Sequence, residues 1–290
     1  MDKGMTDEGV CGSVDDPQCS LFWLPLGSVF LPGLGQGVDD RTWWPYSGVA
    51  LGSAIYANHL ITHHQLDVND LSDPDLVVDG RRDQQAALLS LQTVQTVGFL
   101  SAYDTYRYRA VDLGSLKTDH STVTELFWAP LAFERLARPQ AWAPLLLITG
   151  LATLSLVHAD PPLTRSRPRF RPWDGIFNLG VSANAALGEE AVFRGWLMSY
   201  LEHRWTWDPL LANAVQGLGF GLAHGAFDIR VGLGLYWGWM TQNAGYDLTD
   251  AVLTHFWWDV VIIGDGLLEA RRDPTRRSQG VMFSSPPVAF

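Results

Sequence analysis

The sequence predicts an all-α protein, a polytopic transmembrane bundle of about seven to nine membrane helices. Charged residues make up only 18% of the 290 residues, against about 25% in typical soluble domains. The chain also contains 13 Trp and 28 Gly, residue types that are frequent at membrane interfaces and in packed membrane helices. Several stretches without Asp, Glu, Lys or Arg approach the roughly 20 residues that a helix needs to cross a bilayer.

The N-terminal half shows uncharged stretches that are interrupted by prolines and by one acidic loop. The first stretch contains Pro25 and Pro32, which argue against a straight helix, so we expect it to be re-entrant or interfacial. Trp43 opens the second stretch as an interfacial anchor, and the acidic loop 67–83 separates it from an amphipathic third one. The expected helices of this half cover residues 17–38, 43–60, 84–103 and 122–136.

The C-terminal half follows a clear boundary at the prolines and arginines of residues 160–171. Its expected helices cover residues 141–158, 174–201, 207–226, 231–246 and 248–268. The sequence therefore predicts four parts, which are a polar acidic tail (1–18), N-terminal membrane helices without an assigned role (19–140), a membrane core (141–269) and a polar C-terminal tail (270–290).

Positive charge in short loops marks the cytoplasmic side of a membrane protein. The arginines of residues 165–171 and 271–277 are separated by four expected helices, so both groups can face the cytoplasm. Arg107 and Arg109, two expected helices earlier, fall on the same side, and the acidic loop 67–83 falls outside. Arg135 and Arg138 land on the outer side, against the rule.

The net charge and the small number of cysteines limit which molecules and metal ions the protein can bind. A formal net charge of −11 argues against nucleic acid, because a phosphate backbone requires a basic face. Cys11 and Cys19 are the only cysteines, which leaves no thiolate metal site. They are consistent either with a disulfide in an oxidising compartment or with two unpaired thiols in a mobile tail.

The segment Glu189-Glu190-x-x-x-Arg194 places ionisable residues in an expected membrane helix, where a charge needs a functional or structural reason. Glu190 and Arg194 lie four residues apart and can pair. Glu189 lies about 100° around the helix from Glu190. The arginine can therefore hold one carboxylate while the other acts as a general base.

Two further helices carry pairs of residues at the same spacing. Phe220-x-x-x-His224 places an aromatic ring and an imidazole on one face, and His255-x-x-x-Asp259 does the same for an imidazole and a carboxylate. Three separate helices therefore each present a side chain suited to catalysis, and we expect them to meet in one bundle.

The three elements follow one another along the chain in the order Glu-Glu-x-x-x-Arg, Phe-x-x-x-His and His-x-x-x-Asp. With these elements in this order on membrane helices, the chain resembles the CAAX protease and bacteriocin-processing (CPBP) family of intramembrane proteases, which includes the type II CAAX prenyl endopeptidases. The resemblance covers about residues 141–268. It implies peptide hydrolysis within or at the edge of the membrane. Eukaryotic relatives remove the last three residues of prenylated CAAX proteins, and many bacterial relatives have no assigned substrate.

The resemblance also implies a role for each matching residue. Glu189 with His224 would activate a water molecule for attack on the scissile carbonyl. His255, with the residue four positions later, would stabilise the tetrahedral oxyanion. Glu190 and Arg194 would orient Glu189.

Asp259 departs from the Asn form of this motif, because an ionised carboxylate cannot donate a hydrogen bond to an oxyanion. Either Asp259 is protonated, or it orients His255, or the site holds a metal ion. Glu189, His224, His255 and Asp259 form a nitrogen and oxygen set suited to Zn²⁺. We favour metal-independent glutamate and histidine catalysis, with zinc left open.

Two alternatives come from other functional classes. The protein could be a catalytically silent membrane scaffold or immunity protein, or its ionisable residues could line an ion or proton path. The absence of an internal repeat and of matched broken helices argues against transport. The expected partners are membrane lipids and a peptide or protein substrate at the membrane. The expected location is a prokaryotic inner (plasma) membrane, with the active site toward the cytoplasmic half.

Overall fold

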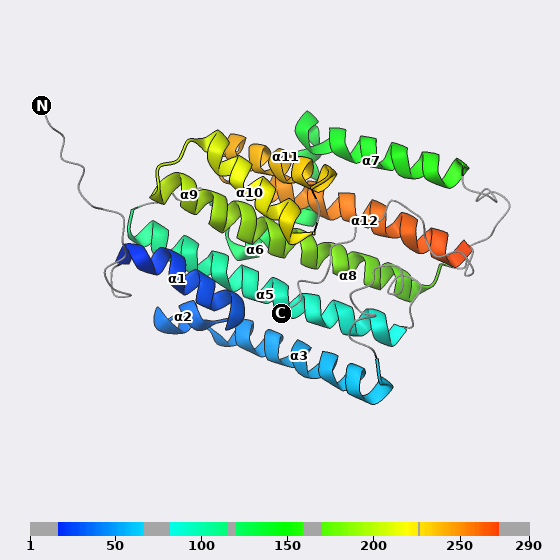
Figure 1. Cartoon of the computed structure of the whole chain (residues 1–290), viewed down its shortest axis with the longest axis horizontal. Helices are drawn as coiled ribbons and strands as arrows, with labels where there is room; N and C mark the ends of the chain where they lie inside the picture. The colour runs from blue at the N-terminus through cyan, green and yellow to red at the C-terminus, as the bar shows by residue number, and fades with distance from the viewer. Residues whose placement is uncertain are drawn as a thin grey trace, which may run out of the picture.

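The computed structural model describes residues 17–66, 82–114, 116, 120–158, 170–225 and 227–272, with side chains up to residue 268. Within these ranges the secondary structure is helical and contains no strand (Figure 1). The all-α prediction is therefore confirmed. The acidic segment 67–81, the Asp160-Pro161-Pro162 break, most of the following arginines and both polar tails lie outside the described residues.

The first uncharged stretch is divided in two, as its prolines predict. Helix α1 (Pro17–Phe30) is followed by the short α2 (Leu34–Val38). Gly33 between them has φ +95°, a conformation that glycine adopts readily and other residues rarely do. Cys19 at the start of α1 is disulfide-bonded, and Cys11, the only other cysteine of the sequence, lies outside the described residues.

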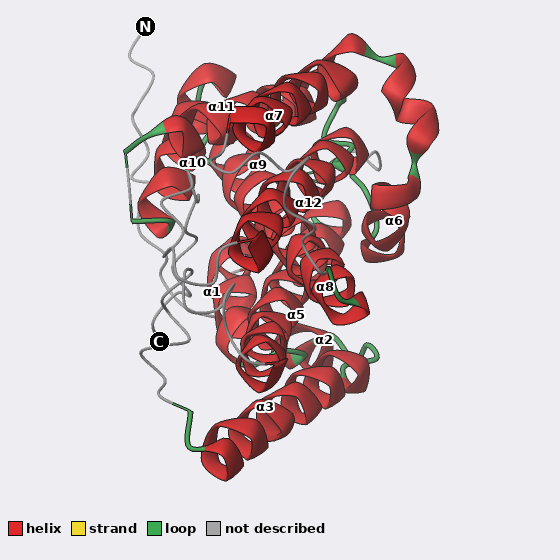
Figure 2. Cartoon of the chain, turned by 90° about the vertical axis from the view of Figure 1, so that its right-hand side faces the viewer, coloured by secondary structure: helices red, strands yellow, loops and turns green. Residues whose placement is uncertain are grey.

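Two long helices complete the N-terminal half. They are α3 (Trp44–His64) and α5 (Arg82–Asp112), and both extend beyond the ranges that the sequence predicts. Helix α5 lies between α1 and α3 on one side and the C-terminal helices on the other (Figure 2). A side chain at Gly98 of α5 would collide with the carbonyl oxygen of Val29, so this glycine allows α1 to pack closely on α5.

The prediction of one helix over residues 122–136 is wrong. The structure has the short α6 (Val123–Trp128) followed by two 3₁₀ turns, η2 (Ala129–Leu131) and η3 (Phe133–Ala137). Thr122 and Glu125 start α6 with reciprocal side-chain bonds to each other's backbone N–H groups, which satisfy donors at the helix start. Pro130 interrupts the α-helical hydrogen bonds one turn later. This segment is too short to cross a bilayer.

The C-terminal half consists of α7 and a series of helices that closely follow the predicted ranges. The bounds are α7 (Pro139–His158), α8 (Pro172–Glu189), η4 (Glu190–Met198), α9 (Ser199–Arg204), α10 (Pro209–Ala223), α11 (Ile229–Asn243) and α12 (Thr249–Arg272). Segments α8, η4 and α9 form one continuous rod, and η4 is a π-helix. The π-helix is the unexpected feature, because such segments are rare and occur frequently at functional sites.

Helix α5 runs parallel to the rod formed by α8, η4 and α9. Two hydrogen bonds between α5 and this rod, one near each end, define the two ends of the bundle. The indole of Trp173 donates to Gln85 at 2.8 Å near the start of both helices. The hydroxyls of Tyr106 and Ser199 lie 3.1 Å apart toward the other end. We call these ends the Trp173 end and the Ser199 end, and they lie at the right and left of Figure 1.

This arrangement corrects the predicted topology. The last turns of α5, which contain Arg107 and Arg109, lie at the Ser199 end (Figure 1). The end of α7 and the start of α8, which flank the arginine-rich segment, lie at the Trp173 end. Arg107 and Arg109 therefore lie at the opposite end of the bundle from Arg171, because residues 122–136 do not span and one expected crossing disappears. The flanks of the acidic segment, His64 and Arg82, also lie at the Trp173 end.

Arg109, Arg135 and Arg138 are each paired with a carboxylate. Arg109 lies 2.6 Å from Asp39, and Arg135 lies 2.9 Å from Asp247. Arg138 likewise donates to Asp250 at 2.8 Å. The pairs of Arg135 and Arg138 neutralise the two charges that disagree with the rule for positive charge in cytoplasmic loops.

Two segments in the described part of the chain are long and apolar enough to cross a membrane, α7 and residues 249–268 of α12. A bundle of seven to nine spans is therefore not confirmed. Helix α7 differs from the core helix of a soluble protein, since only 11% of its span is buried. Leu146, Leu147, Leu151 and Leu154 are all at least half exposed on it, a surface that suits lipid rather than water.

Candidate active site

The three predicted motifs meet in the middle of the C-terminal helices. The first lies at the junction of α8 and η4, the second at the end of α10 and the third in the first half of α12. Helix α10 ends at His224, because Gly225 has φ +73° and turns the chain out of the helix. The imidazole of His224 therefore lies at a helix end, where its Nδ1 lies 2.7 Å from the carbonyl oxygen of Phe220.

Glu190, Arg194 and His255 form the buried centre of the site. Arg194 Nη1 donates to Glu190 Oε1 at 3.1 Å, and both side chains are fully buried. His255 Nδ1 lies 2.8 Å from the same Glu190 oxygen. Arg194 also donates to the carbonyl oxygen of Gly234 on α11 at 3.0 Å. This network joins η4, α11 and α12, and it directs the Nε2 atom of His255 away from the centre.

Glu189 lies on the accessible side of this centre, between two imidazoles. Its carboxylate oxygens are 3.6 Å from His224 Nε2 and 3.7 Å from His255 Nε2. Asp259 Oδ2 is 3.4 Å from the same His255 nitrogen. The side chains of Glu189, Asp259 and His224 are 17%, 22% and 11% exposed, whereas those of Glu190 and Arg194 have no exposed surface. Glu189 Oε2 is buried and has no hydrogen-bond partner among the described residues.

Adjacent glutamates thus occupy different environments, as their positions on the helix predict. Glu190 is fully buried and bound to Arg194, whereas Glu189 is partly exposed and makes only long contacts of 3.6–3.7 Å with the two imidazoles. Glu189 therefore keeps lone pairs that can accept a proton. This is the separation of roles that a pair of carboxylates needs for general base catalysis.

Aromatic rings form one wall of the site. The ring of Phe220 lies 4.5 Å from that of His224, as the motif predicts, and the guanidinium of Arg194 lies over its face at 4.5 Å. Trp237 of α11 stacks on His255 with a centroid distance of 4.0 Å and an angle of 13°. Trp237 could not be predicted as a site residue, because an apolar residue in an apolar helix carries no signal that separates a site residue from the core.

The loop between α10 and α11 is held by an ion pair next to His224. Arg230 donates from Nη2 to Asp228 at 2.6 Å and from Nη1 to the carbonyl oxygen of His224 at 3.2 Å. The hydrogen bond from Arg230 lowers the pKa of Asp228 to about 2. The pair therefore stays charged at any physiological pH and restrains the backbone that carries the imidazole.

The geometry of the site does not support the prediction of a bound metal ion. Among the residues that the structure describes, no group of three or more His, Cys, Asp or Glu side chains is arranged to hold one. The zinc set of Glu189, His224, His255 and Asp259 stays a prediction, and we derive no step through a metal.

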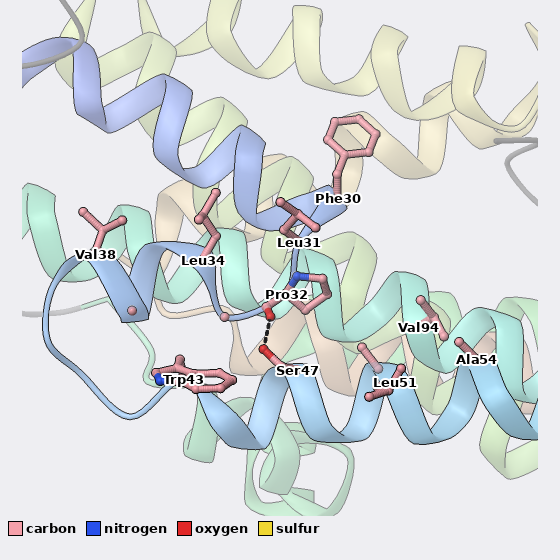
Figure 3. A pocket seen from close by; sticks show the side chains of 13 residues that line it. Phe30, Leu31, Pro32, Leu34, Val38, Trp43, Ser47, Leu51, Ala54 and Val94 are labelled. Carbon is pink, nitrogen blue, oxygen red and sulfur yellow. Dashed lines mark hydrogen bonds between the residues drawn. The ribbon is translucent and has the colours of Figure 1, made fainter.

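Two cavities lie away from these residues. The first, about 620 Å³, lies between the α1–α2 turn and α3 and has an apolar lining (Figure 3). Ser47 donates to the carbonyl oxygen of Pro32 at its wall, at 2.5 Å. The second, about 570 Å³, is lined by both polar and apolar residues of the segment 121–135 and of the α11–α12 loop. Neither cavity is lined by a residue of the candidate site, so neither identifies a substrate pocket.

All six predicted site residues thus come together from η4, α8, α10 and α12, while their catalytic roles stay predictions. Comparison with known families agrees with this location. Residues 171–261 match the family described as type II CAAX prenyl endopeptidase Rce1-like, and this stretch contains all six residues. The chain matches no curated protein and no solved structure.

Proposed function

We propose that this chain, which is Rce1-like over residues 171–261, is an intramembrane endopeptidase that hydrolyses a peptide bond of a membrane-associated substrate. The family is membrane-embedded and implies a protease. One observation carries the proposal, namely the position of the Glu189 carboxylate within 3.6–3.7 Å of the Nε2 atoms of two histidines. The Nδ1 atoms of both imidazoles face acceptor oxygens, so their Nε2 atoms donate hydrogen bonds when the rings are protonated. A general base next to two such donors is the set that addition of water to a carbonyl requires.

In this proposal Glu189 removes a proton from a water molecule while His224 positions it. The water oxygen forms a bond to the scissile carbonyl carbon, and the carbonyl oxygen becomes an oxyanion. Collapse of this intermediate breaks the C–N bond, and the proton held by Glu189 passes to the leaving amine. Glu190 and Arg194 keep the helix at this point in place and take no part in the bond changes.

His255 is proposed to donate a hydrogen bond to the oxyanion. Its Nδ1 is engaged by Glu190 at 2.8 Å. Its Nε2 is 3.4 Å from Asp259 and 3.7 Å from Glu189, so neither carboxylate makes a short hydrogen bond to it. Because Nδ1 donates to the Glu190 carboxylate, Nε2 carries a proton only when His255 is an imidazolium. The proposal therefore requires this protonated form, whose Nε2–H group is available to an incoming oxygen. In this arrangement Asp259 orients the imidazole and does not bind the oxyanion itself.

The exposed apolar face of α7 supports a substrate that is reached from the bilayer. Helix α7 packs on α12, which carries His255 and Asp259, and it presents leucines outward. We therefore propose that the substrate is a hydrophobic or prenylated peptide. A water-soluble peptide would have to cross this apolar surface at a cost in desolvation of its polar groups.

The test is peptide cleavage by the purified protein in detergent, with matched peptides that carry or lack a prenyl group. The variant Glu189→Gln keeps the shape of the side chain and removes the base, so we expect product to fall by at least about 10²-fold. Glu134→Gln, the same change at an exposed position outside the site, is the control and should leave cleavage unchanged.

The outcomes separate the proposal from its alternatives. Cleavage that survives Glu189→Gln would contradict the assignment of the base. Biological function that survives this substitution in a folded protein would favour a scaffold or immunity protein. Cation flux in vesicles without a peptide product would favour a proton path. Metal analysis of the same sample decides whether zinc is bound.

A further inference from the structure

Among the residues that the structure describes, Trp237 is the one large aromatic side chain that stacks on a catalytic-type imidazole and belongs to none of the three motifs. It lies on α11, and only 1% of its surface is exposed. Its ring is nearly parallel to that of His255, at 13° and 4.0 Å. The indole N–H makes no hydrogen bond to any described residue. The contribution of Trp237 to the site therefore comes from the face of its ring.

Helix α11 is held rigidly enough for this stacking to be specific. The carbonyl oxygen of Gly234 accepts hydrogen bonds from Arg194 at 3.0 Å and from Gln216 at 2.9 Å. A Cβ atom at Gly234 would lie 3.0 Å from the Cα atom of Gly217, so the backbones of α10 and α11 are in close contact. Trp237 follows Gly234 by less than one turn, and the same contacts therefore determine its position.

The orientation of the imidazole depends on this stack. His255 must keep Nδ1 toward Glu190 and Nε2 toward Glu189 at the same time. Rotation of the ring about its Cβ–Cγ bond would break both contacts and would also tilt the ring out of the Trp237 plane. Stacked rings have a preferred geometry beyond the burial of apolar area, so the indole restrains this rotation.

We propose that Trp237 is a positioning residue that holds the His255 imidazole in the plane needed to bind the oxyanion. This inference rests on the proposed function. Because misorientation of a donor affects the transition state more than the bound substrate, loss of the stack should lower kcat and leave KM nearly unchanged.

The experiment compares Trp237→Leu, which keeps an apolar side chain, with Trp237→Phe, which keeps an aromatic face. We expect kcat to fall about tenfold in Trp237→Leu and to be largely restored in Trp237→Phe. Trp239→Leu is the matched control, since Trp239 lies on the same helix and is 47% exposed. It should leave kcat unchanged. A Trp237→Leu protein with wild-type kcat, or a Phe variant as impaired as the Leu variant, would overturn the inference.

A second readout does not depend on cleavage. Protein labelled at histidine is measured by NMR, and the His255 signals are identified by their loss in His255→Gln. The indole face should shift the ring protons of His255 upfield, and this shift should disappear in Trp237→Leu and persist in Trp239→Leu. Unchanged His255 signals in Trp237→Leu refute the stack, whereas wild-type protein without any peptide product refutes the proposed function.

Discussion

Replacing Arg194 by methionine should destabilise the bundle strongly, because this residue is half of a fully buried ion pair. Its guanidinium is 3.1 Å from Glu190, and neither side chain has any exposed surface. Methionine keeps most of the volume but leaves the Glu190 carboxylate without its cation. The substitution also removes the hydrogen bond from Nη2 to the carbonyl oxygen of Gly234, which joins η4 to α11.

The magnitude follows from these contacts. Opposite unit charges 3.1 Å apart attract by about 5 kcal/mol at an effective dielectric constant of 20. Removal of one partner of a buried pair typically costs about 3–5 kcal/mol, because the remaining charge stays desolvated. At about 2–4 °C per kcal/mol, the Tm of Arg194→Met should fall by roughly 10 °C.

The assay is thermal unfolding of the purified protein in detergent, for Arg194→Met, Glu190→Gln and the double variant. We expect the double variant to be more stable than Arg194→Met, because glutamine removes the uncompensated charge. Arg135→Met is the control, since Arg135 and its partner Asp247 are 25% and 27% exposed. The second partner of Arg135, the buried Asp250 at 3.5 Å, keeps its shorter pair with Arg138, so the substitution should cost no more than about 1 kcal/mol. An Arg194→Met protein as stable as Arg135→Met would refute the buried pair.

Three further outcomes are expected from the same structure. His224→Gln should lower kcat by about 10²–10⁴-fold with little change in Tm, and a small loss in the peptide assay would show that another group positions the water. Gly195→Ala should lower the free energy of unfolding by about 1–3 kcal/mol, because its Cβ would lie 2.5 Å from a ring carbon of Tyr103; an unchanged Tm would contradict this packing. Burial by itself raises the pKa of Asp247, but hydrogen bonds from neighbours such as Thr249 outweigh it and lower the pKa. Asp247 therefore stabilises the fold fully above its ordinary pKa of about 4, and this stabilisation is lost as the pH falls through the lower pKa that Asp247 has in the folded protein. Acid unfolding of Asp247→Asn should therefore depend less on pH than that of the wild type.

Local helical periodicity accounts for the part of the site that could be predicted. The pairs Glu190 with Arg194 and His255 with Asp259 are four residues apart, and a helix brings such residues to one face wherever it lies in the fold. The predicted ranges of α10, α11 and α12 differ from the observed ones by only a few residues, because each is bounded by Pro, Gly or Asp. Residues 171–261, which match the Rce1-like family, are the part in which these local signals are strongest.

Topology could not be predicted in the same way. The sequence predicts one helix at 122–136, but Pro130 divides it and the remaining turns are too short to span. One false crossing reversed the side assigned to Arg107 and Arg109. The positive charge of Arg109 did not reveal this error, because Arg109 is paired with Asp39, which lies 70 positions earlier in the chain. The sequence alone does not predict such a distant pair.

By itself, the sequence determined that the chain is helical and that three helices each carry a catalytic-type pair, since both properties depend on residues within one or two turns. Only the tertiary structure decided that Glu190 is closed off while Glu189 is reachable, and that Trp237 covers His255. The reason is that burial and stacking depend on helices that meet across long separations in the chain. The hydrogen bond between Glu190 and His255 alone joins residues 65 positions apart, a distance over which no local pattern carries information.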